Sequence, residues 1–288
     1  MNIHVTGASG FLGSSVVPRL IGQGHAVTAL ARSSAAAARV KALEATPISG
    51  DLDDAASLDS AFDASEADAL VNLSSLGFGH APAIVAAAEE AGIKRAVFVS
   101  TTAVFTTLAA GSKAVRLAAE QAVHDSALDW TIVRPTMIYG TPADRNMARL
   151  LKLLQRSPVV PLPGGGRRLQ QPVHVDDLAC AIVAAVESPL TAGHAYDLAG
   201  PEPLTLREVI TEAAAAVNRS PRLVPVPLAP AVAALGLYER MATRPRITAE
   251  QFRRLGEDKA FDITDARRDL GFDPRPFAVG ITEEAALL

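Results

Sequence analysis

A glycine-rich turn close to the N-terminus is the first feature of this sequence that could do chemistry. Gly7, Gly10 and Gly13 follow an apolar segment and precede an amphipathic one. Glycine tolerates the positive φ of a tight turn, lets a ligand approach the backbone and lets a helix pack closely on a strand. The helix N-terminus behind such a turn attracts anions. The spacing therefore predicts a site for the pyrophosphate of a dinucleotide, formed by Gly7, Ser9, Gly10, Phe11, Leu12 and Gly13.

The residues after the second predicted strand indicate which dinucleotide is bound. An acid at this point hydrogen-bonds the ribose hydroxyls of NAD, whereas an arginine suits the 2′-phosphate of NADP. The segment from Val27 to Ser34 contains no acid, and Arg32 and Ser33 end its apolar run. The sequence thus favours NADP(H) over NAD(H), with a solvated surface charge as the alternative role of Arg32.

Alternating strands and helices must hold this turn in place. Strands are predicted at 3–6, 26–30, 46–49, 69–73, 96–100 and 130–133, and helices between them at 12–22, 35–45, 55–62, 82–91 and 112–125. Strands that alternate with helices of this length predict an α/β fold with a doubly wound parallel Rossmann sheet. The apolar run 96–99 is typical of a strand that is covered on both faces.

The alternation weakens after residue 140. Helices are predicted at 147–154, 176–187 and 206–217, a strand at 194–198, and a Pro/Gly-rich connection at 158–172. We therefore expect residues 1–140 to form the dinucleotide-binding Rossmann domain. Residues 141–288 are expected to form a smaller C-terminal α/β substrate lobe that packs partly back onto the sheet.

The composition argues against several classes of protein. The chain has 288 residues and a net charge of −4 without a long basic stripe, so no nucleic-acid role is expected. Cys180 is the only cysteine, which excludes an intrachain disulfide. The N-terminus lacks the pattern of a signal peptide, and prolines break the apolar stretch 223–238. We expect a cytoplasmic protein without a membrane span.

Five motifs are spread over almost the whole chain, at residues 6–13, 50–52, 99–102, 131–140 and 172–179. Together they resemble the short-chain dehydrogenase/reductase superfamily, in its extended or atypical branch. The last two, 131–140 and 172–179, are similar to those of sugar-nucleotide epimerases and dehydratases. The resemblance implies a second lobe that forms a substrate cleft over the nicotinamide. The expected partner is a small-molecule substrate. A homodimer with a second copy of the chain is also compatible with the sequence.

Further cofactor contacts are expected at the ends of the other strands. Asp51 and Leu52, after the third strand, would border the adenine, and Asp51 has an alternative role as the N-cap of the helix at 55–62. The remaining expected cofactor contacts are Leu73, Ser74, Arg116, Pro135 and Met137.

The catalytic pair of the family is the point where this sequence departs from it. In the family a Ser or Thr after the fifth strand orients the substrate, and Thr101 matches that position. A Tyr four residues before a Lys transfers the proton. None of the tyrosines, which are Tyr139, Tyr196 and Tyr238, has a lysine four residues later.

Two registers are possible for the helix that should hold this pair. Lys113 would place Ala109 at the tyrosine position, whereas Glu120 as the helix acid places Ser112 and Arg116 at the Tyr and Lys positions. We prefer the second register, because it keeps the helix length. Ser112 is a poor general acid, and Arg116 stays charged, so it can hold a ribose or phosphate but cannot relay a proton.

Both residues also have structural alternatives, and the proton donor stays unassigned. Ser112 could be the N-cap of the helix, and Arg116 a surface charge. The favoured interpretation is an NADP(H)-binding atypical oxidoreductase that acts on a small carbonyl, hydroxyl or nucleotide-sugar substrate. The alternatives are a nucleotide-sugar epimerase or dehydratase, and a non-catalytic NADP(H)-binding sensor or assembly factor.

The other polar candidates are interpreted mainly as structural. Tyr139 is expected to be packed rather than to donate a proton, and His80 to be a surface histidine. His174 and Asp176 are expected to be structural, with Asp177 as a helix cap, so no metal is predicted. Four arginines could meet an anionic substrate or be solvated charges: Arg145, Arg149, Arg167 and Arg168.

Overall fold

The computed structural model describes residues 1–108, 111–241 and 249–288, which form two compact units. The first unit comprises Met1–Pro135, Val175–Leu198 and Ile263–Asp273, and the second comprises Thr136–His174, Ala199–Asp262 and Pro274–Leu288. The sequence boundary at residue 140 differs from this division at Pro135. The reason is that the short strand β7 (Ile138–Tyr139) pairs with β10 (Val173–His174) inside the second unit.

A seven-stranded, wholly parallel sheet forms the centre of the first unit, in the order β11-β6-β5-β4-β1-β2-β3. Its strands are β1 (Asn2–Thr6), β2 (Ala26–Ala31), β3 (Thr46–Ser49), β4 (Ala69–Asn72), β5 (Arg95–Val99), β6 (Asp129–Pro135) and β11 (His194–Leu198). The predicted doubly wound fold is confirmed. The order reverses between β1 and β4, which is where ligands bind in such sheets.

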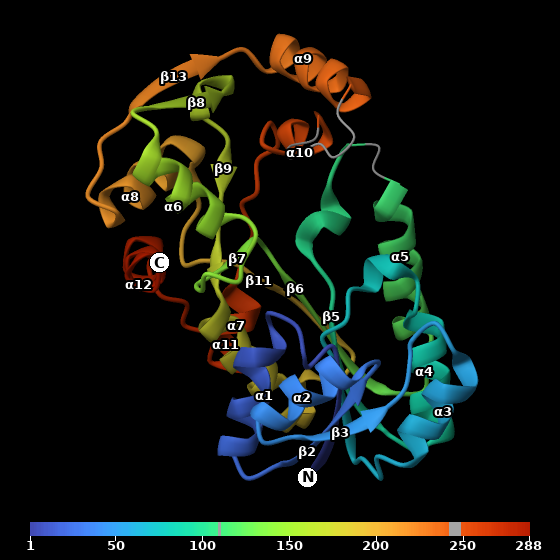
Figure 1. Cartoon of the computed structure of the whole chain (residues 1–288). Coiled ribbons are helices and arrows are strands. Elements are labelled where there is room, and N and C mark those ends of the chain that lie inside the picture. Colours follow the sequence, from blue (N-terminus) through green and yellow to red (C-terminus); the bar gives the residue numbers. More distant parts are fainter. Residues whose placement is uncertain (109–110, 242–248) are drawn as a thin grey trace. The chain divides into compact units, whose positions relative to one another are not determined.

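Helices cover both faces of this sheet (Figure 1). They are α1 (Gly13–Gly22), α2 (Ser34–Ala42), α3 (Ala55–Asp63), α4 (Ala81–Glu90), α5 (Gly111–His124), α7 (Val175–Glu187) and α11 (Thr264–Leu270). Helix α1 packs against α7, while α3, α4 and α5 pack in a row. Three short 3-10 helices follow strands or helices: η1 (Leu76–Phe78), η2 (Thr102–Phe105) and η4 (Pro189–Thr191).

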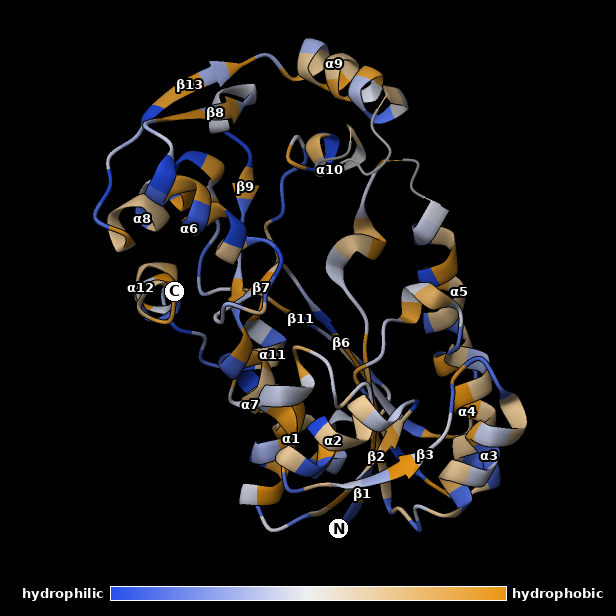
Figure 2. Ribbon diagram, in the orientation of Figure 1, coloured by the Kyte–Doolittle hydropathy of each residue, from blue (hydrophilic) through white to orange (hydrophobic). Residues whose placement is uncertain are grey.

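Apolar side chains from the sheet and from the helix row α3–α5 form one core of the first unit. Phe62, Leu70, Ile84 and Phe98 are fully or almost fully buried in it. Residues 96–99 of β5 are all buried, which confirms the expected strand with two covered faces. Figure 2 shows how polar and hydrophobic residues are distributed along these elements.

The second unit contains more strands than the sequence predicts. Its strands besides β7 and β10 are β8 (Val159–Pro163), β9 (Leu169–Gln170), β12 (Leu204–Thr205) and β13 (Arg222–Val226). Its helices are α6 (Met147–Arg156), η3 (Gly164–Gly166), α8 (Leu206–Ala216), α9 (Leu228–Met241), α10 (Ala249–Arg254) and α12 (Phe277–Ala286). The predicted Pro/Gly-rich connection at 158–172 therefore includes β8, η3 and β9. Its strands form because β8 pairs with β13 and β9 with β12, far along the chain.

Among the residues that the structure describes, no helix has both the length and the apolar character that crossing a lipid bilayer requires.

Candidate dinucleotide and catalytic site

The glycine turn joins β1 to α1 in a conformation that two of its glycines make possible. Gly7 has a φ of 76°, and a Cβ atom there would lie 2.8 Å from the backbone nitrogen of Ser74. A Cβ on Gly13 would lie 2.1 Å from the carbonyl oxygen of Ala8. Neither position accepts a side chain without a shift of backbone, so both glycines are required by the turn.

The start of helix α1 fits an anion. Its N-cap residue, Leu12, offers no capping side chain, and no acid lies in the first turn. Within the described part of the chain, the backbone N–H groups of Phe11, Leu12 and Gly13 make no hydrogen bond. Together with the positive end of the helix dipole, these donors suit a pyrophosphate. A Cβ on Gly10 would meet only the carbonyl oxygen of Gly7, which leaves its outer side open.

The end of β4 lies directly against this turn. The N–H of Leu73 donates to the carbonyl of Thr6 at 3.0 Å. The carbonyl of Ser74 accepts from the Asn72 side chain at 3.2 Å. The predicted contacts Leu73 and Ser74 are therefore brought beside Gly7, while the half-buried Ser9 belongs to the turn itself.

Arg32 and Ser33 are exposed at the end of β2. Ser33 is the N-cap of α2, and its hydroxyl accepts from the N–H of Ala36 at 3.2 Å. In the chain as described, the Arg32 guanidinium makes no hydrogen bond or ion pair. An exposed cation beside a helix N-terminus is the environment that a phosphate monoester prefers.

Asp51 and Leu52 are half-buried after β3. The alternative role of Asp51 as a helix cap is wrong, because α3 is capped by Asp54, whose carboxylate accepts from the N–H of Ser57 at 3.3 Å. The Asp51 carboxylate instead accepts from the N–H of Asp53 at 3.2 Å.

His80 is half-buried and hydrogen-bonded to an acid. Its Nε2 atom lies 2.8 Å from the carboxylate of Asp53. The pair ties the start of α4, where His80 is the N-cap residue, to the segment before α3.

Thr101 is half-buried and is the N-cap residue of η2. Its hydroxyl accepts from the N–H of Ala103 at 3.3 Å. The two neighbouring hydroxyls are buried, since Ser100 donates to the Glu120 carboxylate and Thr102 donates to the Pro135 carbonyl at 3.3 Å. Of these three hydroxyls, the one on Thr101 is the best placed to meet a substrate.

A cluster of charged residues lies next to the segment 100–102. Arg134 binds both oxygens of Glu120, the shortest contact being 2.7 Å, and lies 3.9 Å from Asp197. Burial raises the pKa of Asp197, and the charge of Arg134 opposes this rise. The Arg134 guanidinium also lies 5.3 Å from the centre of the Phe105 ring, within cation–π range.

Ser112 and Arg116 form a hydrogen-bonded pair on α5. The guanidinium of Arg116 donates to the Ser112 hydroxyl at 2.8 Å, which is the contact that an i, i+4 spacing permits. The N-cap alternative for Ser112 is wrong, because α5 begins at Gly111. The other register depends on Ala109, which lies outside the described residues, and Lys113 donates to the carbonyl of Thr106 at 2.6 Å.

Arg116 also contacts the segment after β4. A Cβ on Gly77 would lie 3.1 Å from the Arg116 Nε atom. The sequence analysis did not single out Gly77. The only signal for it was a glycine that follows a predicted strand. Of the two contacts expected near the nicotinamide, Pro135 is buried at the end of β6 in the first unit, and Met137 is half-buried in the second.

Tyr139 is fully buried in the second unit, which confirms that it is a packed residue. Its ring contacts those of His174 and Phe277 at centroid distances of 5.3 and 5.1 Å. The expected cap role of Asp177 is wrong, because α7 already begins at Val175.

The remaining questions from the sequence concern metal ligands, of which none was predicted, and four arginines that could bind an anionic substrate. No cluster that could hold a metal occurs among the described residues. Arg168 forms an ion pair with Asp258 at 2.9 Å. Arg145, Arg149 and Arg167 are exposed, as solvated charges would be.

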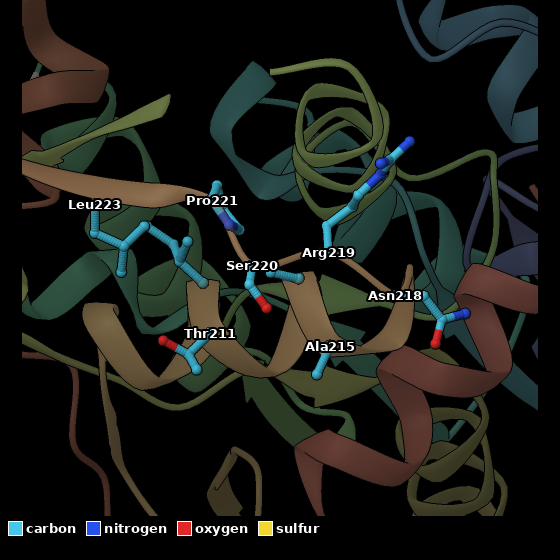
Figure 3. Close-up of a pocket in the computed structure, with 9 residues that line it drawn as sticks. Thr211, Ala215, Asn218, Arg219, Ser220, Pro221 and Leu223 are labelled. Carbon is cyan, nitrogen blue, oxygen red and sulfur yellow. The ribbon is translucent and has the colours of Figure 1, made fainter. Parts of the chain in front are cut away.

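A cavity of about 320 Å³ lies elsewhere in the second unit, between α8 and the segment that leads into β13 (Figure 3). It is lined by Ile210, Thr211, Ala214, Ala215, Asn218, Arg219, Ser220, Pro221 and Leu223. None of the residues predicted from the sequence to bind cofactor or substrate belongs to it.

The sheet order and the free N–H groups of the glycine turn are those of an α/β protein with a dinucleotide site. Over residues 7–189 the chain matches the family described as NAD(P)H-binding. The chain thus belongs to this NAD(P)H-binding family.

Individual relatives agree with this assignment. The chain is 28% identical to the 4-hydroxy-2-methyl-3-oxo-4-farnesyl-3,4-dihydroquinoline-1-oxide ketoreductase of Stigmatella aurantiaca, over 96% of this chain and 92% of that protein. It is 30% identical to the ceramide reductase of Caulobacter vibrioides, over 78% of this chain and 73% of that protein. Its fold is similar to that of a UDP-glucuronic acid 4-epimerase from Bacillus cereus, with a TM-score of 0.75, 17% identity and coverage of 100% and 98%.

Proposed function

We propose that the chain is an NADP(H)-dependent reductase of a ketone. The observation on which the cofactor preference rests is Arg32, exposed at the end of β2 and bonded to no described residue, in a segment without an acid. A carboxylate at this place would repel a 2′-phosphate, whereas a guanidinium binds it with two hydrogen bonds. The reductase names of two relatives support the direction of the reaction.

The chain's own groups would bind and orient the substrate. A bound nicotinamide supplies hydride from its C4 atom. The Thr101 hydroxyl holds the carbonyl oxygen, and the Ser112 hydroxyl adds a second hydrogen bond. Arg116 donates to the Ser112 oxygen, which leaves the Ser112 hydrogen free to point at the substrate. Because neither Ser112 nor Arg116 titrates near neutral pH, water delivers the proton.

Cofactor preference is tested by titrating NADPH and NADH into the chain and into an Arg32→Asp variant. We expect the parent to prefer NADPH roughly tenfold or more, as the loss of one charge-assisted pair predicts, and the variant to lose that preference. Arg39, on the same helix α2 but farther from the strand end, provides the control as Arg39→Asp. Equal affinities of the parent for both dinucleotides refute the proposal.

Turnover is tested with a panel of ketones and of sugar nucleotides. A Ser112→Ala variant should bind NADPH normally and lose roughly tenfold in kcat, because one hydrogen bond to the substrate oxygen is removed. Complete loss of activity would make Ser112 the essential proton donor and contradict the mechanism.

A non-catalytic dinucleotide-binding protein is the second candidate, and the missing Tyr-x-x-x-Lys pair favours it. It predicts tight NADPH binding and no turnover of any compound in the panel.

A further inference from the structure

Two phenylalanines are exposed where strands β4 and β5 end. Phe78 closes η1 and is 74% exposed, and Phe105 closes η2 and is 50% exposed. Both 3-10 helices directly follow their strands at the carboxyl edge of the sheet. This is the edge at which α/β proteins bind ligands.

The segments that present these rings carry no charge. Residues 69–79 and 96–112 contain no Asp, Glu, Lys, Arg or His. A substrate that is recognised through phosphates or carboxylates would find no ionic partner in either segment. Exposed apolar groups that gather in one place mark a binding surface more often than a solvated one.

The first two turns of α5 hold both segments. Arg116 lies against Gly77 in η1, and Lys113 donates to the carbonyl of Thr106, the residue that follows η2. A third apolar side chain, Val115, comes from the same turns and is 39% exposed. A Cβ on Gly79 would lie 3.9 Å from it. The two phenylalanines are therefore anchored to one short stretch of helix.

Phe105 is also fixed on its inner side and linked to the polar site. The guanidinium of Arg134 lies 5.3 Å from its ring centre. Thr101 is the N-cap of the 3-10 helix that Phe105 ends, so the hydroxyl proposed to hold the carbonyl oxygen and the aromatic ring belong to one short segment. The ring is held in position while half of it faces solvent.

We propose that Phe78, Phe105 and Val115 bind the apolar chain of the substrate, so that the site takes carbonyl compounds bearing an alkyl or aryl arm. Only the identity of the reacting group rests on the proposed function. The apolar arm would be held by contacts within the first unit and would lie next to the Thr101 hydroxyl.

The test measures the affinity of 2-alkanones of increasing length by calorimetry, with and without NADPH, and follows NADPH consumption in parallel. For the parent we expect the affinity to rise roughly twofold to fourfold with each added methylene that is buried. Phe105→Ser and Phe78→Ser should reduce this dependence on chain length. Leu190→Ser, which changes an 80% exposed side chain on η4, is the matched control and should leave it unchanged.

The outcomes separate this inference from the proposed reductase activity. Affinity that rises with chain length in the absence of any turnover would refute the reductase and leave the apolar site standing. Affinity independent of chain length would overturn the apolar site, whether or not short ketones are reduced. Light scattering completes the test. If Phe105→Ser converts a dimer to a monomer without altering the length dependence, the surface joins two copies of the chain and the inference is wrong.

Discussion

Replacing Glu284 with glutamine should stabilise the second unit at neutral and alkaline pH. Glu284 lies on α12 with no exposed surface, and its carboxyl group accepts from the N–H of Gly140 at 2.9 Å. Its other neighbour is the buried Asp144, whose carboxylate accepts from the N–H groups of Asn146 and Met147 at 2.6 and 2.8 Å. Burial, together with the hydrogen bond and charge of Asp144, raises the pKa of Glu284 to about 9.

The size of the effect follows from this pKa. In the unfolded chain Glu284 releases its proton near 4.5, whereas the folded chain keeps it up to about 9. Stability from this group is therefore fully present below pH 4.5 and is lost as the pH rises towards 9. At about 1.4 kcal/mol per pH unit, the loss reaches on the order of 3 kcal/mol at pH 7. Glutamine can accept from the same Gly140 N–H and has no proton to release, so the variant avoids this loss.

Thermal unfolding of parent and Glu284→Gln across pH 4 to 9 provides the measurement. We expect the two melting temperatures to coincide near pH 4 and the variant to melt progressively higher as the pH rises. Glu283→Gln is the control, because the Glu283 side chain is about half exposed and pairs with Arg275. A difference that does not grow with pH, or a variant that is less stable than the parent at pH 8, would refute the reasoning.

Three further predictions concern the first unit. Burial lowers the pKa of His4 from 6.5 to about 4, so the unfolded chain takes up this proton first, and the unfolding free energy of the parent should fall by about 3 kcal/mol as the pH falls from 6.5 to 4; a His4→Leu variant should lack this fall in pH-dependent denaturation. Gly13→Ala should abolish NADPH binding in calorimetry, because its Cβ meets backbone at 2.1 Å, whereas Gly22→Ala, with nothing within 4 Å, should retain it. Glu120→Ala should cost about 3 kcal/mol in urea denaturation by leaving Arg134 without its bidentate partner, and a loss under about 1 kcal/mol would contradict this.

Local sequence signals were enough to predict the sheet that holds the dinucleotide site. The glycine spacing and the short apolar strands of the first half are patterns within a few residues of sequence. They can therefore be recognised without knowledge of the tertiary structure. The i, i+4 placement of Ser112 and Arg116 was likewise readable, because residues at that spacing share a helix face.

Features that depend on distant segments could not be read in this way. Strand β8 exists only because Arg222–Val226 lies beside it. Glu284 directly follows Glu283 in the sequence, and only its packing against Asp144, far back along the chain, distinguishes the two acids. The cap of α3 shows a third limit. Several acids precede that helix, and the backbone path decides that Asp54 rather than Asp51 reaches the free N–H group.

In the proposed reductase, the Ser112–Arg116 pair would orient the substrate oxygen without supplying a proton itself. A guanidinium that donates to the serine oxygen fixes the direction of the serine hydrogen, just as a positioned donor must be fixed to stabilise charge that develops on oxygen. Neither group changes its charge near neutral pH, so the pair can stabilise an alkoxide but cannot neutralise it. The site must then remain open to water on the side of the substrate oxygen. The exposed phenylalanines at the same sheet edge would bind the apolar arm without closing that access.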